Sequence, residues 1–215
     1  MIPLLVDASG VNMGTGFVLD GAFVEKTRAA FPLAGKPLMD CGSTTEIYDA
    51  GDTIYRLASD GASHAFVIRA GSEGLAVPKC FNDWGRLEGD GDMAGYDDLW
   101  LAEFEKLVPL SVSPELESEV KAWIKAVLDL AEVDDPLVIE RDELERVRLA
   151  IPKCETPVSL ALVAETMVFM CEQCLKESAD LDFNETNLMM RPSTGEVLVT
   201  DPAHGYYQCH RSSVP

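Results

Sequence analysis

Residues 181–202, which read LDFNETNLMMRPSTGEVLVTDP, constrain the fold of this chain more than any other stretch. After Asn187, the apolar run 188–190 leads into residues 191–196, where Pro, Ser, Thr and Gly are typical of a tight turn. A β-branched and apolar run, 197–200, follows and ends at Asp201. The pattern therefore predicts two short antiparallel strands joined by a turn.

Three oxygen-bearing side chains flank this predicted hairpin. Asp182 and Asn187 lie on the polar segment that enters it, and Asp201 ends its second strand. Because paired strands place their outer ends side by side, we expect Asn187 and Asp201 to lie close in space, with Asp182 just before them. Carboxylate and amide oxygens are ligands that Mg²⁺ prefers, in sites that substrate phosphates complete. A polar loop with Asx turns and no ligand would show the same pattern, so the residues alone leave both interpretations open.

The spacing of these residues resembles that of a known superfamily. Asp182, then Asn187 five residues later, then a hairpin ending in Asp201, is similar to the catalytic and metal loops of protein kinases and aminoglycoside-phosphotransferase-like enzymes. The form N-x-M-x-R at 187–191, with Asp-Pro at the end of the hairpin, is most similar to the early serine/threonine protein kinases of tailed podophages. The resemblance implies that Asp182 is the catalytic base, that Asn187 and Asp201 hold Mg²⁺, and that ATP is the phosphoryl donor.

The resemblance also implies a fold class, α+β, with a small antiparallel-sheet lobe followed by a reduced, mostly helical lobe that carries the hairpin. Only 13 residues follow Pro202, so we expect the helices of the second lobe to come from residues 113–176. The adenine-binding hinge is expected between residues 137 and 153. The expected divisions are an N-terminal decoration at 1–52, a sheet-plus-helix nucleotide lobe at 53–108, and a helical lobe with the catalytic loop and metal-binding hairpin at 109–215.

Within the nucleotide lobe we predict a three-stranded meander followed by a helix. The expected strands are 53–57, 64–69 and 75–81, and the expected helix is 96–108. By the resemblance, Gly61 lies in the turn over the nucleotide phosphates, and Lys79 on the third strand reaches those phosphates. A glutamate on the helix, Glu103 or Glu105, is expected to pair with Lys79, and Glu103 is preferred. Lys79 as a plain surface lysine, and Glu103 as a solvated helix charge, are the alternatives.

The second half of the chain shows clearer helix signals. Ser113-Pro114 and Thr156-Pro157 each combine an N-cap residue with a proline suited to the first helical turn. Residues 137–140 are a short strand candidate, and residues 142–151 fit a helix or a strand equally well. The apolar stretch after Pro157 predicts a deeply buried helix that ends just before Asp182.

Six cysteines raise the question of a metal site. Cys171 and Cys174 form a C-x-x-C pair, and His204, Cys209 and His210 could complete a zinc site with it. However, the pair lies in a strongly helical stretch and no second tight pair exists. Reduced, mostly buried thiols are therefore favoured.

The charge balance is strongly acidic, with 17 Lys and Arg against 37 Asp and Glu and a net charge of -20. Such a balance disfavours binding to nucleic acid, which needs clustered basic side chains. It suits solubility, and it also suits a basic-faced protein partner. No apolar run of 18 residues and no signal-peptide pattern is visible, so we expect no membrane association and a cytoplasmic location, the host cytoplasm if the chain is phage-encoded.

Two classes of function therefore compete. The first is phosphoryl transfer to Ser or Thr of host proteins, which is what the resemblance implies. The alternative is a catalytically impaired kinase-like protein that binds and inhibits a basic-faced host protein through its acidic surface. A metal-dependent hydrolase using Asp182 and Asp201 is a weaker third interpretation, because no His cluster or nucleophile motif supports it.

Overall fold

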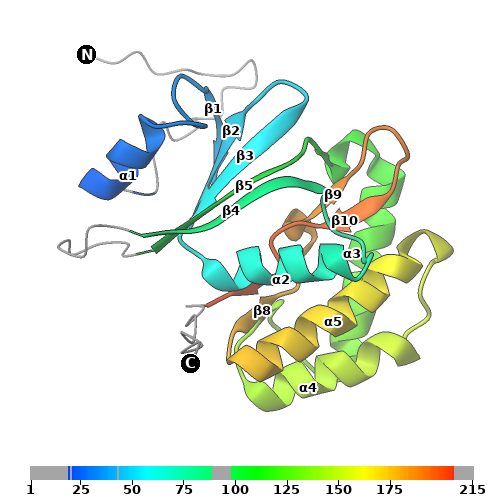
Figure 1. Cartoon of the computed structure of the whole chain (residues 1–215). Coiled ribbons are helices and arrows are strands. Elements are labelled where there is room, and N and C mark those ends of the chain that lie inside the picture. Colours follow the sequence, from blue (N-terminus) through cyan, green and yellow to red (C-terminus); the bar gives the residue numbers. More distant parts are fainter. Residues whose placement is uncertain (1–18, 20, 43, 89–97, 206–215) are drawn as a thin grey trace, which may run out of the picture.

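The computed structural model describes residues 19, 21–42, 44–88 and 98–205. A five-stranded antiparallel sheet forms one lobe, and helices α3, α4 and α5 form most of the other (Figure 1). The predicted α+β architecture, a small sheet lobe followed by a mostly helical lobe that carries the hairpin, is confirmed. Helix α2 lies between the sheet and α5 (Figure 1).

The sheet has the strand order β1-β2-β3-β5-β4, with every neighbouring pair antiparallel. Its strands are β1 (Leu38–Cys41), β2 (Thr45–Asp49), β3 (Thr53–Ala58), β4 (Cys80–Glu88) and β5 (Asp98–Glu105). Strands β1 and β2 thus belong to the same sheet as β3, β4 and β5, and the expected boundary at residue 52 cuts through this sheet. The expected hairpin at 17–24 lies partly outside the described residues, and its second half belongs to helix α1 (Ala22–Arg28).

Both faces of the sheet are buried, which explains one wrong prediction. On β5, Leu99 and Leu101 belong to a cluster on the outer face under α1, whereas Ala102 and Phe104 belong to the main core. A strand covered on both sides carries apolar residues at nearly every position, so its period of two is hidden. The helix expected at 96–108 is therefore strand β5, and Glu103 lies on a strand.

A helix replaces the second strand of the expected meander. Helix α2 (Gly61–Ser72) begins after Asp60, whose carboxylate accepts the N–H groups of Ala62 (2.9 Å) and Ser63 (3.1 Å). An Asp at that position is a strong N-cap, because it satisfies backbone donors that the helix itself cannot. Gly61 is consequently the first residue of a helix, and the prediction that it forms a turn over the phosphates is wrong.

The third expected strand, 75–81, is mostly a loop, since β4 begins only at Cys80. The loop joins two parts of the helical lobe: the Ala76 N–H donates to Thr166 Oγ1 (2.8 Å), and the Ala76 carbonyl accepts the Val199 N–H (2.8 Å). Because its backbone groups are used in this way, the segment does not join the sheet, and Lys79 precedes the strand on which it was expected.

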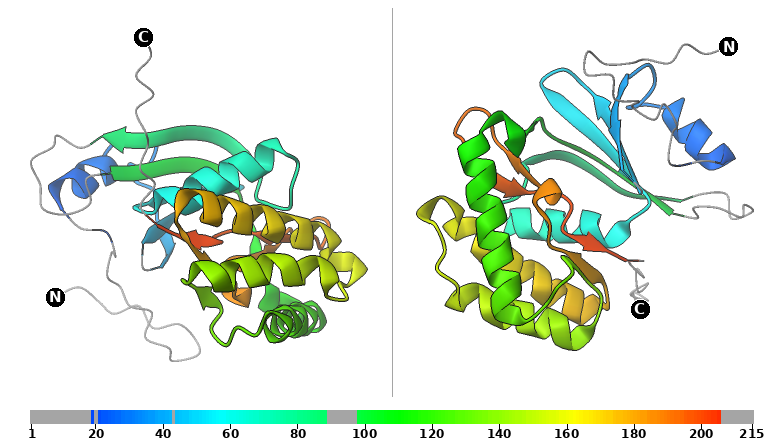
Figure 2. Two further views of the ribbon diagram at one scale, coloured as in Figure 1. Left: turned by 90° about the horizontal axis from the view of Figure 1, so that it is seen from below. Right: turned by 180° about the vertical axis from the view of Figure 1, so that it is seen from behind.

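The helical lobe follows the predicted order. Its helices are α3 (Pro114–Ala131), α4 (Arg141–Ala150) and α5 (Ala161–Glu177), all before the hairpin in sequence and packed side by side (Figure 2). Pro114 is the first residue of α3, as predicted, and α4 settles the open assignment of residues 142–151 as a helix. Helix α5 begins after a short 3₁₀ turn, Val158–Leu160, slightly later than predicted.

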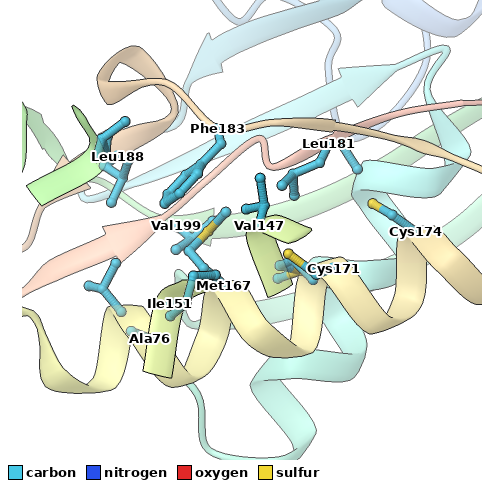
Figure 3. Close-up of a cluster of buried hydrophobic side chains, with 14 of the residues drawn as sticks. Ala76, Val147, Ile151, Met167, Cys171, Cys174, Leu181, Phe183, Leu188 and Val199 are labelled. Carbon is cyan, nitrogen blue, oxygen red and sulfur yellow. The ribbon is translucent and has the colours of Figure 1, made fainter. Parts of the chain in front are cut away.

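Helix α5 contributes several buried side chains to the main core. Met167 and Cys171 on α5 pack toward Leu181 and Phe183 from the segment that follows it (Figure 3). Val158–Glu177 is long and apolar enough to cross a membrane by length and composition, with a mean hydropathy of 1.5, as core helices also can be. Here it packs against α2, α4 and β10.

The cysteine pair of α5 does not form part of a metal site in the described residues. Cys171 and Cys174 are buried, and burial raises the pKa of both thiols. Within the described ranges, no group of three or more His, Cys, Asp and Glu side chains gathers where a metal ion could be held. Two residues of the conceivable zinc set, Cys209 and His210, lie outside those ranges.

Two small antiparallel sheets complete the helical lobe. One has the order β10-β9-β6, with β6 (Val108–Pro109), β9 (Leu188–Met190) and β10 (Val197–Val199); the other has the order β11-β8-β7, with β7 (Leu137–Val138), β8 (Asp180–Asp182) and β11 (Ala203–His204). The predicted hairpin is confirmed: Val199 pairs with Leu188, and Val197 pairs with Met190. The chain passes from the sheet lobe to the helical lobe at residues 106–109, whereas residues 137–153, where the hinge is expected, lie within the helical lobe.

Candidate active site

A cleft of about 290 Å³ separates the inner face of the sheet from the β9–β10 hairpin. Strands of the sheet line one side and the hairpin lines the other; the lining includes Thr45, Ile47, Arg56, Asn187, Met189 and Asp201. Two of the predicted site residues, Asn187 and Asp201, therefore face this cleft.

The clearest contact across the cleft joins Asp201 to the sheet lobe. Asp201 Oδ1 lies 2.7 Å from Arg56 Nη2 on β3, and it also accepts a hydrogen bond from the Ser63 hydroxyl of α2. Ser63 Oγ in turn accepts from Arg56 Nη2 (3.1 Å). The Asp201 carboxylate thus binds Arg56 on strand β3 and Ser63 in the first turn of α2.

Arg56 was missed by the sequence reasoning, although it is the cation that pairs with Asp201 across the cleft. Its side chain is only 6% exposed, and its Nη1 has no hydrogen-bond partner among the described residues. Thr45 also lines the cleft, and its buried Oγ1 likewise has no hydrogen-bond partner among the described residues. Buried polar groups are costly unless a partner satisfies them, so this corner of the cleft suits an oxygen-rich anion such as phosphate.

Backbone hydrogen bonds bring Asp182, Asn187 and Asp201 together. The Asp182 N–H donates to the Pro202 carbonyl (3.0 Å), and the Thr200 N–H donates to the Asn187 carbonyl (2.8 Å). Asn187 Nδ2 donates to the Asp182 carbonyl (3.2 Å). The geometric expectation for the three residues is therefore met, while their chemical roles stay predictions.

The donor set fits a magnesium ion. Asn187 Nδ2 donates to the Asp182 carbonyl, so the amide Oδ1 can bind a ligand. The contacts of Asp201 with Arg56 and Ser63 use its Oδ1, so its Oδ2 can bind a ligand as well. Mg²⁺ in nucleotide sites takes one or two protein oxygens and completes its shell with water and phosphate. Asn187 and Asp201 are thus the residues that would hold it.

Lys79, Glu103 and Gly61 do not come together at the cleft. Lys79 Nζ stands 5.0 Å from the centre of the Phe81 ring, and its side chain lines a different hollow. Glu103 accepts hydrogen bonds from the Thr53 hydroxyl (2.7 Å) and from Asn82 (2.5 Å). The predicted Lys79–Glu103 pair is therefore wrong, because the helix that was to carry Glu103 is a strand.

Glu105, at the end of β5, joins the two lobes near the cleft. Arg191 of the hairpin donates to it from Nε (2.8 Å) and Nη2 (2.6 Å). Such a bidentate pair is geometrically specific, and here the glutamate is only 16% exposed. This hydrogen bonding to Arg191 holds the pKa of Glu105 below its ordinary value.

The pair should make stability depend on pH in a defined direction. A carboxylate with a lowered pKa stabilises the fold above its ordinary pKa, and this contribution is lost as the pH falls through the lowered pKa. We expect Glu105→Gln to lower the Tm at pH 7 and to match the wild type at strongly acidic pH. Glu145→Gln, which breaks an exposed pair with Arg148, is the matched control and should change the Tm little. A Tm difference for Glu105→Gln that stays constant with pH would contradict this role.

Comparison with known proteins gives only distant similarity. No family model and no curated protein matches the chain. Among solved structures, it is similar to the apo form of a thermostable mutant of aminoglycoside phosphotransferase APH(4)-Ia, with a TM-score of 0.33 and 18% identity over 80% of this chain and 68% of that one. It is also similar to a further mutant of that enzyme in a ternary complex with AMP-PNP and hygromycin B, with a TM-score of 0.34 and 15% identity over 86% of this chain and 73% of that one.

Proposed function

We propose that this chain is a kinase-like phosphotransferase that uses ATP and Mg²⁺. The observation that carries the proposal is the contact of Asp201 with Arg56 across the cleft, beside Asn187. A carboxylate and an amide oxygen on one wall, facing an incompletely paired guanidinium on the other, form a site for a metal-bound polyphosphate.

Each residue then has a defined part in the transfer. Arg56 holds phosphate oxygens through the N–H group that the protein leaves unpaired. Asp182 accepts the proton of an acceptor hydroxyl while that oxygen bonds to the γ-phosphorus and the bond to the ADP oxygen breaks. Bound Mg²⁺, held by Asn187 and Asp201, would neutralise charge on the phosphate oxygens.

Arginine suits its position better than lysine would. Its guanidinium keeps its charge when buried and offers several donors in a fixed plane, so Arg56 can bond Asp201, Ser63 and a phosphate at once. Ser63 on the first turn of α2 is a neutral partner for this cation. A hydroxyl there leaves more of the positive charge for a ligand.

The acceptor and the setting are the finer part of the proposal. The similarity of residues 187–202 to the podophage kinases favours a Ser or Thr hydroxyl of a host protein, in the host cytoplasm. The competing function is an acidic, catalytically impaired protein that binds and inhibits a basic-faced host protein. It differs from the first in needing no nucleotide.

Thermal melting with and without Mg-ATP tests the proposal directly. A ligand that binds only the folded state at 100 times its Kd stabilises by about 2.7 kcal/mol, so the Tm should rise by several degrees. Arg56→Met should abolish this rise, whereas Lys79→Met should keep it, because Arg56 lines the cleft and Lys79 does not. A wild-type Tm that does not respond to Mg-ATP would instead favour the acidic binding protein.

A further inference from the structure

His204 lies beside the proposed base Asp182, in strand β11. This strand pairs with β8 in a register that sets His204 opposite Asp180 and Ala203 opposite Leu181. Because side chains alternate across a sheet and paired residues share a face, His204 stands on the same face as Asp180 and Asp182. Ala203 and Leu181 point to the other face, where both are buried.

The His204 imidazole contacts carboxylates from both lobes. Its Nδ1 lies 3.3 Å from Asp60 Oδ2, and its Nε2 lies 3.8 Å from Asp182 Oδ2. Asp60 starts helix α2 of the sheet lobe, whereas Asp182 ends strand β8 of the helical lobe. Since both nitrogens of an imidazolium are donors, protonated His204 can bridge the two carboxylates.

Asp60 is a fixed anchor for this bridge. Its side chain is only 4% exposed, and its Oδ1 caps α2 through the N–H groups of Ala62 and Ser63. Its Oδ2 also accepts the Gly205 N–H (3.2 Å), from the residue directly after His204. Three backbone N–H groups fix the position of the Asp60 carboxylate, so this carboxylate orients the His204 imidazole.

The charged groups that face His204 in the described part of the chain are acidic. They are Asp60 at the start of α2, Asp180 and Asp182 on β8, and Asp201 at the end of β10. The contact with Asp60 raises the pKa of His204 above its ordinary value, and the charges of Asp201 and Asp182 add to this effect. A raised pKa means that the charged bridge persists to a higher pH than an ordinary imidazole would allow, and it is lost as the pH rises through that pKa.

We propose that His204 is a positioning residue, which holds the Asp182 carboxylate against the anchored Asp60 and so aligns the base with the acceptor hydroxyl. The inference rests on the proposed phosphotransfer. His204 is not among the residues that line the nucleotide cleft, so it acts through Asp182 and not on ATP. The turnover rate should therefore fall when the imidazole loses its proton, while binding of ATP should not change.

Titration by NMR tests the bridge without any assay of activity. The Cε1 proton of each imidazole reports its protonation, and the signal that is missing in His204→Gln belongs to His204. Replacing Asp182 by Asn removes one negative neighbour, so the titration midpoint of His204 should fall by about half a pH unit or more. Asp60→Asn keeps an N-cap residue and should lower the midpoint further. An unchanged midpoint in Asp182→Asn would overturn the inference.

Kinetics then test the consequence for catalysis. His204→Gln should lower kcat about tenfold, leave the KM for ATP within twofold, and lose the decline of kcat at high pH. His204→Arg keeps a charge and several donors at every pH, so it should recover part of kcat and also lose the decline. A proportionate loss of folded protein, with kcat per folded molecule unchanged in His204→Gln, would reduce His204 to a structural role and overturn the inference.

The two proposals fail in different ways. If the wild type transfers no phosphoryl group but Asp182→Asn still shifts the His204 midpoint, the bridge stands and only the proposed function fails. If transfer occurs and the midpoint does not move, the proposed function stands and the role of His204 is refuted.

Discussion

Asp201→Asn should lower phosphoryl transfer to a protein acceptor by about 10²–10³-fold, the scale on which single groups that stabilise transition-state charge contribute. The substitution keeps the size of the side chain and removes the charge that faces Arg56 at 2.7 Å and would hold Mg²⁺ beside Asn187. The measurement is transfer of label from γ-labelled ATP to generic protein acceptors, with Mg²⁺ present.

The control for that experiment is a carboxylate far from the cleft. Asp129 on α3 is 64% exposed, and among the described residues its side chain pairs only with Lys125 one turn away, so Asp129→Asn should transfer label at the wild-type rate. Equal labelling by the wild type and by Asp201→Asn would show that the hairpin carboxylate takes no part in transfer.

Phe183→Ala should lower the free energy of unfolding by about 3–5 kcal/mol, the usual cost of truncating a large side chain in a close-packed core. Phe183 is fully buried, and its ring meets that of Trp123 edge-on at 5.6 Å. In Figure 3 the ring points toward Met167 and Val199. The loss is expected because α5 and the hairpin cannot close over the space that the ring leaves.

Chemical denaturation monitored by circular dichroism measures this loss. Phe31→Ala is the matched control, because Phe31 is 84% exposed and its truncation should change the free energy by less than about 0.5 kcal/mol. A cost below about 1 kcal/mol for Phe183→Ala would mean that the core around Phe183 repacks freely, and the expected loss of packing would be wrong.

The hairpin was predictable because its determinants are local. The turn residues between 191 and 196 and the apolar runs on either side specify two paired strands without help from distant segments. The pairing of Val199 with Leu188 then places Asp201 beside Asn187. Helix α3 was predictable for the same reason, since Ser113 and Pro114 mark its start in the chain itself.

The sheet lobe was harder to predict, because burial on two sides removes the pattern on which prediction depends. Residues 99–102 of strand β5 are all apolar and show no alternation, since Leu101 faces the cluster under α1 and Ala102 faces the main core. The strand expected at 64–69 is part of helix α2, and the Asp60-Gly61 pair before it, which is also typical of a turn, precedes a helix here. The structure shows that the same aspartate is an N-cap.

The sequence by itself determined the three oxygen-bearing residues at 182, 187 and 201 and the ribbon that gathers them, because turn chemistry and strand pairing act over a few residues. Only the tertiary structure decided which cation faces them. Arg56 lies 145 residues before Asp201 in the chain, and nothing local distinguishes it from Lys79. That choice depends on how the sheet packs over the hairpin, because a buried guanidinium is stable only where a carboxylate and a hydroxyl arrive from other elements to receive its hydrogen bonds.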